Sequence, residues 1–458
     1  MMDTTTAAQL TGGRRVGTNA MFRRVTTDTR ELRTGDLFVA IAGERFDGHD
    51  FVAAALAGGA SAAMVDDAHA RSLTGNLVAV ADTRAALAAL AAAWRRRFTL
   101  PLVVVTGSNG KTTVKEMTAA ILRAHYGDEE VLATRGNFNN DIGLPLTLLG
   151  LRASHRAAVI ELGMNHRGET RALAAIAQPT IALVNNAQRE HQEFMRSVGE
   201  VADEHADAIV ALPRAKGVAV INGDDPHARV WRDAAARVEA RLLSFGIADD
   251  ADVRGSVLGR TVDGSEIDLR IAGRSLHVRV HAPGIAMARN ALAAAAAAHA
   301  AGAAPEAIVR GLAQFRPVRG RLAALATSSG ATIVDDTYNA NPDSVREGID
   351  VLAHAGGRRW LVLGDMGEVG ALGRAYHREI GEYARIAGID RLLATGPLAR
   401  EAVLAFGAHA AHYDDLDTLL AALAPPLPAD VTLLVKGSRF MRMERVVAAL
   451  AGGIAEGH

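Results

Sequence analysis

Residues 102–113 read LVVVTGSNGKTT, and this stretch decides the fold. The continuous apolar run Leu102–Thr106 is typical of a parallel strand that is buried on both faces of its sheet. Gly107 and Gly110 bound the following loop, where they let backbone N–H groups turn inward around phosphate oxygens. An apolar strand that runs into such a loop predicts an α/β fold with a phosphate site at the edge of a parallel sheet.

The loop leads into a helix predicted from Lys111 to about Ala124. Lys111 can reach the β- and γ-phosphates of a nucleotide, and the Thr112 hydroxyl can ligate Mg²⁺. The standard spacing G-x-x-x-x-G-K-[ST] is not met, because position 105 is Val rather than Gly. A plain strand–turn–helix junction would explain the glycines, but not a lysine followed by two hydroxyls at a helix start. We therefore expect nucleotide binding by Gly107, Ser108, Asn109, Gly110, Lys111, Thr112 and Thr113.

The 458 residues of the chain suggest about three domains. We expect an N-terminal domain at residues 1–100, whose first 20 residues form a tail. A central nucleotide-binding domain is predicted at 101–312, and a C-terminal domain at 313–458. Within the central domain, residues 249–281 alternate polar and apolar side chains and predict an antiparallel insertion.

Strand–helix alternation resumes in the last third of the chain. Strands are predicted at residues 332–335, 360–364, 391–394 and 433–435, each followed by a helical segment. Parallel units that recur in this way predict a doubly wound, Rossmann-like sheet. The predicted fold class is therefore α/β with three domains.

Charge composition argues against several classes of function. Fifty Lys and Arg residues against 51 Asp and Glu give a formal net charge of −1, so no excess positive charge is available to hold nucleic acid or an anionic membrane. The chain has no cysteine, which excludes disulfides, thiolate metal sites and cysteine nucleophiles. Residues 1–20 contain no apolar run typical of a targeting segment. We expect a soluble, cytoplasmic monomer that binds neither nucleic acid nor membrane.

Two residues are candidate metal ligands. Glu161 lies in the predicted strand at residues 157–162, near its carboxyl end, where ligands bind in open α/β sheets. A hard cation prefers such an oxygen ligand, although a strand-end carboxylate in water is an equally good interpretation. His191 follows the predicted strand at 181–185. A lone histidine is usually structural or exposed, and the sixteen histidines show no H-E-x-x-H spacing, so the residues alone leave its role open.

Polar side chains also gather at strand ends in the last third. Residues 335–342 read DDTYNANP, which suits a tight turn but also suits ligand recognition. Just upstream, Gly320-Arg321 could place a guanidinium on a phosphate. Lys436-Gly437-Ser438-Arg439 follows the predicted strand at 433–435. Each group alone is a weak signal, but together they predict a C-terminal face that closes over the loop at 107–113.

Several motifs resemble those of the Mur ligases of peptidoglycan synthesis. They are TGSNGKTT at 106–113, ELGM at 161–164, DDTYNANPDS at 335–344, LGDMGE at 363–368 and VKGSR at 435–439. The turn YNANP at 338–342 is similar to that of the MurF type. In the first hundred residues, TDTR at 27–30, GDLFVA at 35–40 and DGHDF at 47–51 resemble the UDP-sugar-binding domain of the same family. The resemblance covers nearly the whole chain.

The resemblance implies an ATP-dependent amide ligase with ATP and Mg²⁺ as cofactors. ATP would phosphorylate the terminal carboxylate of UDP-MurNAc-tripeptide, and the amine of D-alanyl-D-alanine would attack the resulting acyl phosphate. A carboxylate is a poor electrophile because its leaving group would be oxide, and phosphorylation supplies a better one. The acyl phosphate must be shielded from water, so we expect the C-terminal domain to close for catalysis.

The resemblance also implies which residues serve this reaction. Lys111, Glu161 and His191 are the implied catalytic residues. Thr112 and Glu161 would ligate the ATP-associated Mg²⁺, and His191 a second Mg²⁺ near the acyl phosphate. The residues implied around ATP, besides the loop, are Asn290, Arg321, Asn339 and Asn341. Those implied for substrate binding are Thr29, Arg30, Asp47, Gly48, His49 and Lys436, with Lys436 near the incoming substrate.

Two segments depart from the family pattern. Residues 284–290 read GIAMARN and keep only the final Asn of the usual H-N pair. Related ligases place a modifiable lysine downstream of the metal-binding histidine, whereas Val201–His205 contains none. A mechanism that uses a carbamylated lysine is therefore not expected here.

Two alternative functions stay open at this point. A ligase of the same superfamily could add a single amino acid, or glutamate to folate, although the turn at 338–342 argues against this. A nucleotide-dependent switch would need only the chemistry of the central domain, and it leaves the first hundred residues unexplained.

Overall fold

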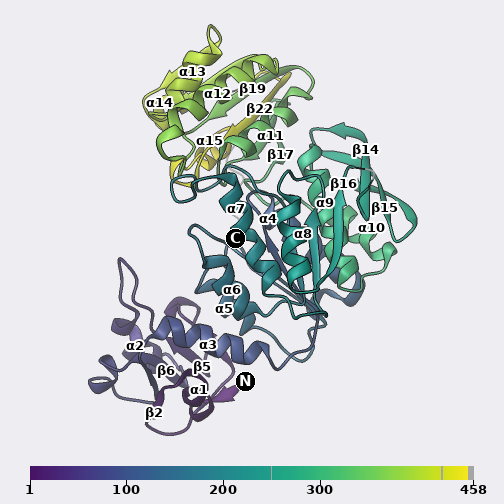
Figure 1. Cartoon of the computed structure of the whole chain (residues 1–458). Coiled ribbons are helices and arrows are strands. Elements are labelled where there is room, and N and C mark those ends of the chain that lie inside the picture. Colours follow the sequence, from purple (N-terminus) through teal and green to yellow (C-terminus); the bar gives the residue numbers. More distant parts are fainter. Residues whose placement is uncertain (249, 424–425, 452–458) are drawn as a thin grey trace.

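The computed structural model describes residues 1–248, 250–423 and 426–451. Figure 1 shows three α/β domains in succession, with the N-terminal domain at the bottom, the central domain in the middle and the C-terminal domain at the top. Each domain is built on its own main β-sheet. Among the helices of the described ranges, none has both the length and the apolar composition needed to cross a membrane.

The N-terminal domain has a five-stranded sheet in the order β2-β7-β6-β5-β4 and a separate pair of short strands, β1 and β3. Its elements are β1 (Met2–Asp3), α1 (Thr4–Thr11), β2 (Arg14–Val16), β3 (Met21–Phe22), β4 (Arg24–Thr26), β5 (Asp36–Val39), α2 (Val52–Ala57), β6 (Ala62–Asp66), β7 (Leu77–Val80) and α3 (Thr83–Arg95). The first 20 residues do not form the tail expected from the sequence. Asp3 caps α1, and Arg15 in β2 pairs with Val78 in β7, a contact between segments distant in sequence.

The central domain has a nine-stranded sheet in the order β16-β15-β14-β13-β12-β11-β8-β10-β9. Its strands are β8 (Leu102–Thr106), β9 (Val131–Ala133), β10 (Ala157–Glu161), β11 (Ile181–Val184), β12 (Val218–Asn222), β13 (Arg241–Gly246), β14 (Val253–Thr261), β15 (Gly264–Ile271) and β16 (Arg274–Val280). Strands β8 to β13 are parallel, as predicted for the stretch around residue 102.

Strands β14 to β16 are antiparallel to one another, as predicted for this part of the chain. Phe245 in β13 pairs in parallel with Val253 in β14, so the ribbon extends the central sheet at one edge. The first residue of the predicted insertion, Asp249, lies outside the described residues.

Helices cover both faces of the central sheet, and the side chains of β8 show the division. Val103 and Val105 belong to the core beneath α4, α9 and α10, whereas Val104 belongs to the core beneath the other helices. The helices are α4 (Lys111–Tyr126), α5 (Gly143–Leu148), α6 (Glu169–Ala177), α7 (Val198–Val210), α8 (Ala228–Arg237), α9 (Ile285–Ala300) and α10 (Pro305–Gln314). In α9, Ala291 and every residue of 293–298 are buried alanines.

The C-terminal domain has a six-stranded sheet in the order β17-β18-β22-β19-β20-β21, parallel except for the edge strand β17. Its elements are β17 (Ala323–Ala326), β18 (Thr332–Asp336), α11 (Pro342–Ala353), β19 (Arg358–Leu363), α12 (Gly373–Ile386), β20 (Arg391–Thr395), α13 (Ala399–Phe406), β21 (Ala410–Tyr413), α14 (Leu416–Ala422), β22 (Val431–Lys436) and α15 (Glu444–Leu450). Helices α11 to α13 pack on one face, and α14 and α15 on the other. This is the doubly wound arrangement predicted from the strand–helix alternation.

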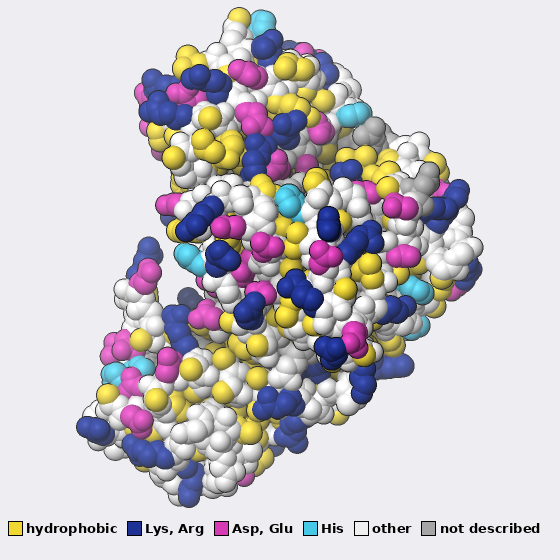
Figure 2. All heavy atoms as spheres, in the orientation of Figure 1, with side chains coloured by type: hydrophobic (Ala, Val, Ile, Leu, Met, Phe, Trp, Pro, Cys, Tyr) yellow, Lys and Arg dark blue, Asp and Glu magenta, His cyan; other side chains and the backbone are white. Residues whose placement is uncertain are grey.

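The boundary proposed after residue 312 falls in the last turn of α10, which ends at Gln314. That helix packs against α4 of the central domain. Figure 2 shows that the surface is hollowed between the N-terminal and central domains, and that charged side chains of both signs are interspersed over this face.

Candidate active site

A cavity of about 650 Å³ lies between the loop at 107–113 and the C-terminal domain. It brings together most of the residues singled out from the sequence. Those that line it are Ser108, Asn109, Gly110, Lys111, Thr112, Thr113, Glu161, His191, Asn290, Arg321, Asn339, Asn341 and Lys436. The carboxyl ends of β8, β10, β18 and β22 therefore meet at one site, as expected for α/β sheets that bind ligands there.

The loop has the backbone conformation that its glycines allow. Gly107 and Gly110 have φ angles of +136° and +81°, which L side chains rarely adopt. A Cβ at Gly107 would lie 2.9 Å from the Cβ of Asn185, and one at Gly110 would lie 2.5 Å from Oδ1 of Asn290. Both positions therefore require glycine. Gly110 then forms the N-cap of α4, so the positive end of the helix dipole points at the cavity.

The segment after β11 braces this loop. The Asn109 backbone N–H donates to Oδ1 of Asn186 (2.8 Å), and the Ser108 N–H donates to the Asn186 carbonyl (3.1 Å). Asn185 Nδ2 donates to Oδ1 of Asn290 (2.9 Å), which fixes the buried Asn290 side chain beside the loop. The phosphate-binding loop is thus held in shape by side chains from two other elements.

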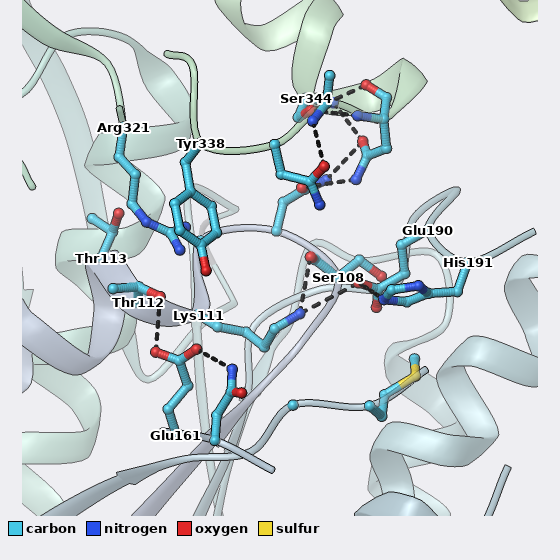
Figure 3. A pocket seen from close by; sticks show the side chains of 18 of the residues that line it. Ser108, Lys111, Thr112, Thr113, Glu161, Glu190, His191, Arg321, Tyr338 and Ser344 are labelled. Atoms are coloured by element: carbon cyan, nitrogen blue, oxygen red, sulfur yellow. Dashed lines mark hydrogen bonds and ion pairs between the residues drawn. The ribbon is translucent and has the colours of Figure 1, made fainter. Parts of the chain in front are cut away.

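Lys111 lies in the middle of this arrangement, as Figure 3 shows. Its Nζ donates to the carbonyls of Gly107 (2.6 Å) and Ser108 (3.2 Å) and lies 3.3 Å from Oε2 of Glu190. Burial opposes ionisation of Glu190, but the charge of Lys111 and the hydrogen bond from His205 lower the pKa of Glu190 to about 2. The carboxylate is therefore ionised at neutral pH.

Glu161 and Thr112 bring together side-chain oxygens that could bind a metal ion on the other side of the loop (Figure 3). The Thr112 hydroxyl donates to Oε2 of Glu161 (2.8 Å), and Asn139 Nδ2 donates to Oε1 (2.7 Å). Glu161 is buried, and its own backbone N–H is held by Thr134 Oγ1 (3.0 Å). A carboxylate and a hydroxyl of this kind suit a hard cation such as Mg²⁺.

His191 lies where the central and C-terminal domains meet. Its φ of +48° is a left-handed conformation that turns the side chain toward the cavity. Nδ1 lies 2.5 Å from Oε2 of Glu368 in the C-terminal domain, and Nε2 lies 3.7 Å from Oε2 of Glu190. One imidazole therefore stands between two carboxylates.

The C-terminal domain contributes an aromatic face, an amide and a lysine. The Arg321 guanidinium stacks 4.1 Å from the ring centroid of Tyr338, and both point toward the loop (Figure 3). Asn341 caps α11, and its Nδ2 donates to Oδ1 of Asn109 (3.0 Å) across the domain junction. Lys436 is buried, 2.5 Å from Oδ2 of Asp336, and it donates to the Asn339 carbonyl (3.0 Å).

The N-terminal candidates lie outside this cavity. The exposed Arg30 pairs with Asp28 (2.6 Å), and Thr29 belongs to the same short 3₁₀ turn. His49 is buried, with Nδ1 2.6 Å from Oδ1 of Asp47 and Nε2 accepting from the Asp66 N–H (3.1 Å). Both ring nitrogens of His49 are thus used within the domain. Gly48 approaches the Ile41 backbone so closely that a Cβ would lie 2.5 Å from its nitrogen.

Several residues of the site were not identified from the sequence. Glu190, Glu368 and Arg189 line the cavity. Arg189 forms ion pairs with Asp343 (2.6 Å) and Glu379 (2.7 Å) of the C-terminal domain. The sequence contains one pattern that could have identified Arg189 and Glu190. Residues 185–191 read NNAQREH, an almost wholly polar run directly after a buried strand. The partners of these residues are distant in sequence, so only the fold brings them together.

Comparison with known proteins places this architecture in a family. Family profiles match three consecutive parts of the chain: the Mur ligase family, catalytic domain at residues 22–95, the Mur ligase middle domain at 105–298, and the Mur ligase, glutamate ligase domain at 320–439. The UDP-N-acetylmuramoyl-tripeptide–D-alanyl-D-alanine ligase of Escherichia coli K12 is 41% identical over 456 residues, which cover 98% of this chain and 99% of that protein.

Solved structures agree with this result. MurF from Acinetobacter baumannii matches with a TM-score of 0.88 at 33% identity and covers 98% of both chains. MurF from Thermotoga maritima, solved in complex with ADP, matches with a TM-score of 0.81 at 27% identity and covers 94% of this chain and 97% of its own. The resemblance predicted from the motifs is confirmed. The chain therefore belongs to the Mur ligase family, and within it to the MurF type.

Proposed function

We propose that this chain is an ATP-dependent amide ligase that adds D-alanyl-D-alanine to UDP-MurNAc-tripeptide in cytoplasmic peptidoglycan precursor synthesis. The observation that carries the proposal is the cavity, which joins a phosphate-binding loop to polar strand ends of a second domain. Relatives named for this reaction match nearly the whole chain. A solved relative of the same type holds ADP, which supports ATP as the nucleotide.

The reaction has two steps. The terminal phosphoryl group of ATP passes to a carboxylate oxygen of the tripeptide, so the bond to ADP breaks and an acyl phosphate forms. The amine of the dipeptide then attacks the acyl carbon, the amide bond forms and inorganic phosphate leaves with the bonding electron pair. Two anions approach each other in the first step. Lys111 and the N-terminus of α4 offset this repulsion because both present positive charge to the phosphates.

We assign Thr112 and Glu161 to the divalent cation that accompanies ATP, because their oxygen donors lie together beside the loop. His191 is assigned to a second cation nearer the acyl phosphate. Mg²⁺ held by these residues would neutralise charge on the phosphoryl oxygens.

The remaining residues that line the cavity are assigned to its two ligands. We assign Asn290, Arg321, Asn339 and Asn341 to the nucleotide, and Lys436 to the incoming substrate. Thr29, Arg30, Asp47 and Gly48 are assigned to the UDP-sugar, with the buried His49 holding the loop at 47–51 in shape. The C-terminal domain excludes water from the acyl phosphate when it covers the loop.

The test measures ADP and inorganic phosphate with each substrate alone and with both, and identifies the product by mass spectrometry. The proposal expects ADP release only when UDP-MurNAc-tripeptide and D-alanyl-D-alanine are both present. Oxygen-18 placed in the acceptor carboxylate should appear in the released phosphate. Equal ADP release without the dipeptide would exclude ligation. Product formation with meso-diaminopimelate or glutamate in place of the dipeptide would identify a different ligase of the superfamily.

A further inference from the structure

Glu190 has no function in the reaction described above, yet its carboxylate lies at the centre of the phosphate end of the cavity. Its Oε2 is 3.3 Å from Lys111 Nζ and 3.7 Å from His191 Nε2, while Oε1 is 3.1 Å from His205 Nε2. The side chain is only 6% exposed, and it lines the cavity. One carboxylate thus joins the phosphate-binding lysine to the histidine assigned to the second cation (Figure 3).

A buried histidine fixes the direction of this carboxylate. The His205 side chain, on α7, is fully buried, and its Nδ1 lies 2.9 Å from the hydroxyl oxygen of Thr106. When the Thr106 hydroxyl donates to Nδ1, the ring proton is on Nε2 and is donated to Glu190. Thr106 is the last residue of β8, so Glu190 is tied to the strand end from which the phosphate-binding loop starts.

Charge balance shows what Glu190 requires during the reaction. Lys111 is the cation beside Glu190 in this structure, but the same ammonium group is needed on the phosphates. As Lys111 engages a phosphate, Glu190 keeps its contact with His205, loses its nearest lysine and gains another anion nearby. A buried carboxylate in that position is costly unless a second cation reaches it. The oxygen that faces Lys111 also faces His191, so a cation between the two side chains would restore the balance.

We infer that Glu190 is a further ligand of the active site: an unmodified carboxylate, oriented by His205, that binds a divalent cation together with His191 while Lys111 engages the phosphates. The inference rests on the proposed function, since that reaction brings nucleotide and cation to the cavity. It also gives a use to the segment Val201–His205, in which the lysine of related ligases is absent and His205 donates to Glu190 instead. Glu190 supplies its negative charge without any carbamylation.

The experiment measures Mn²⁺ binding to the full chain by electron paramagnetic resonance, with and without a non-hydrolysable imido analogue of ATP. In the presence of the analogue, Glu190→Gln should weaken binding of one Mn²⁺ by about 10- to 100-fold. Glu190→Asp, which keeps the carboxylate, should recover part of this loss. His205→Gln should weaken the same Mn²⁺ less, because the carboxylate stays but loses its orienting donor. Glu193→Gln is the matched control, because Glu193 lies on the same segment with an exposed side chain.

Wild-type Mn²⁺ affinity and stoichiometry in a folded Glu190→Gln variant would overturn the inference. The inference would also be overturned if Glu190→Gln lost the same amount of affinity for the ATP analogue in metal-free buffer as in the presence of Mn²⁺. Glu190 would then act only on Lys111. Thermal melting checks folding, and Glu190→Asp carries the test if Glu190→Gln does not fold. Amide formation by the wild-type chain is measured separately. Its absence would reject the proposed function and leave the Mn²⁺ comparison intact.

Discussion

The central domain meets its two neighbours through different chemistry. Toward the N-terminal domain, α3 packs on α5 and α6 in one continuous apolar core. Trp94 in α3 donates its indole N–H to the Leu151 carbonyl (3.1 Å), and the buried Arg95 donates to the Ala177 carbonyl (3.1 Å). We call this junction the N-terminal seam.

Toward the C-terminal domain, the junction beside the cavity is polar, and we call it the cavity seam. Its contacts are ion pairs of Arg189 with Asp343 and Glu379, amide contacts of Asn109 with Asn341 and of Gln188 with Glu347, and the contact of His191 with Glu368. Separating two apolar surfaces costs free energy in proportion to the apolar area that becomes exposed to water. Separating partly exposed polar groups costs little, because they exchange their protein partners for water. The main apolar core of the central domain also continues into the C-terminal domain, so this junction is polar only on the side of the cavity. We expect these polar contacts to exchange when the C-terminal domain closes over the cavity.

The largest effect is expected inside the cavity beside the cavity seam, and on turnover rather than on folding. Lys111→Ala should lower turnover by at least about 10³-fold, because removal of a cation from a phosphoryl-transfer site has effects of this order. Cooperative thermal unfolding should persist, since Lys111 lies at the start of a helix and not in a core. Lys216→Ala, at an exposed position, is the control. Near-wild-type ligation by Lys111→Ala would refute the assignment of the loop.

The second effect is expected at the N-terminal seam, and on folding rather than on chemistry. Trp94→Ala should lower the free energy of unfolding by about 3–5 kcal/mol, the usual cost of removing a buried tryptophan. Trp231→Ala is a matched control, because Trp231 is also buried and donates to a backbone carbonyl, that of Ala202 (3.0 Å), but within one domain. Only Trp94→Ala should make the connection at residues 96–101 sensitive to limited proteolysis. Equal sensitivity in both variants would remove the distinction between the two seams.

A third, smaller effect concerns domain placement. Arg189→Gln removes the ion pairs of Arg189 with Asp343 and Glu379 across the cavity seam. The free energy of unfolding should fall by only about 1–2 kcal/mol, because the side chains of both pairs are partly exposed. Turnover should fall by about tenfold, since misplacement of catalytic groups by small distances has costs of this size or larger. Small-angle scattering should show a broader distribution of domain positions. Arg346→Gln is the control, because Arg346 pairs with the same Glu379 (3.0 Å) within the C-terminal domain. A change in scattering for Arg346→Gln alone would contradict the role of Arg189.

The last effect is a pH dependence that arises from one carboxyl group at the cavity seam. Burial raises the pKa of Glu347 from 4.5 to about 7. Between these values the unfolded chain releases a proton that the folded chain keeps, so this group's contribution to stability falls as the pH rises from about 4.5 to 7. Glu347→Gln should flatten that part of the profile of unfolding free energy against pH. Glu382→Gln, at an exposed position of α12, should leave it unchanged.

Much of the lining of the cavity could be predicted from local sequence. The loop at 107–113, Glu161 and the turn at 335–342 each follow a buried strand, and the rule that parallel strands share one carboxyl edge brought them together correctly. Glu190 was missed because its partners, Lys111 and His205, are joined to it only by the fold. His205 alone could have indicated such a contact, because a histidine on the apolar face of a helix needs a buried hydrogen-bond partner.

Other features depend on contacts that local patterns do not encode. The edge strand Arg14–Val16 is fixed by its pairing with β7, so residues 1–20 resembled a tail. The ribbon of β14 to β16 is joined to the central sheet by only a short parallel pairing of β13 with β14, and its alternating pattern gave no indication of this connection. Strands β9, β17 and β21 lie at the edges of their sheets and are only partly buried. They therefore lack the continuous buried apolar run from which the equally short β11 was predicted.

Helix α9 sets a limit on how this chain can vary. The alanines at 291 and 293–298 are buried, and the helix packs against α4 and several strands, while Asn290 contacts the loop through Asn185. A side chain larger than alanine there would push α9 away from its neighbours and shift Asn290 with it. In a library of random substitutions, α9 should therefore show the same intolerance as the catalytic residues, although most of its side chains never meet a substrate.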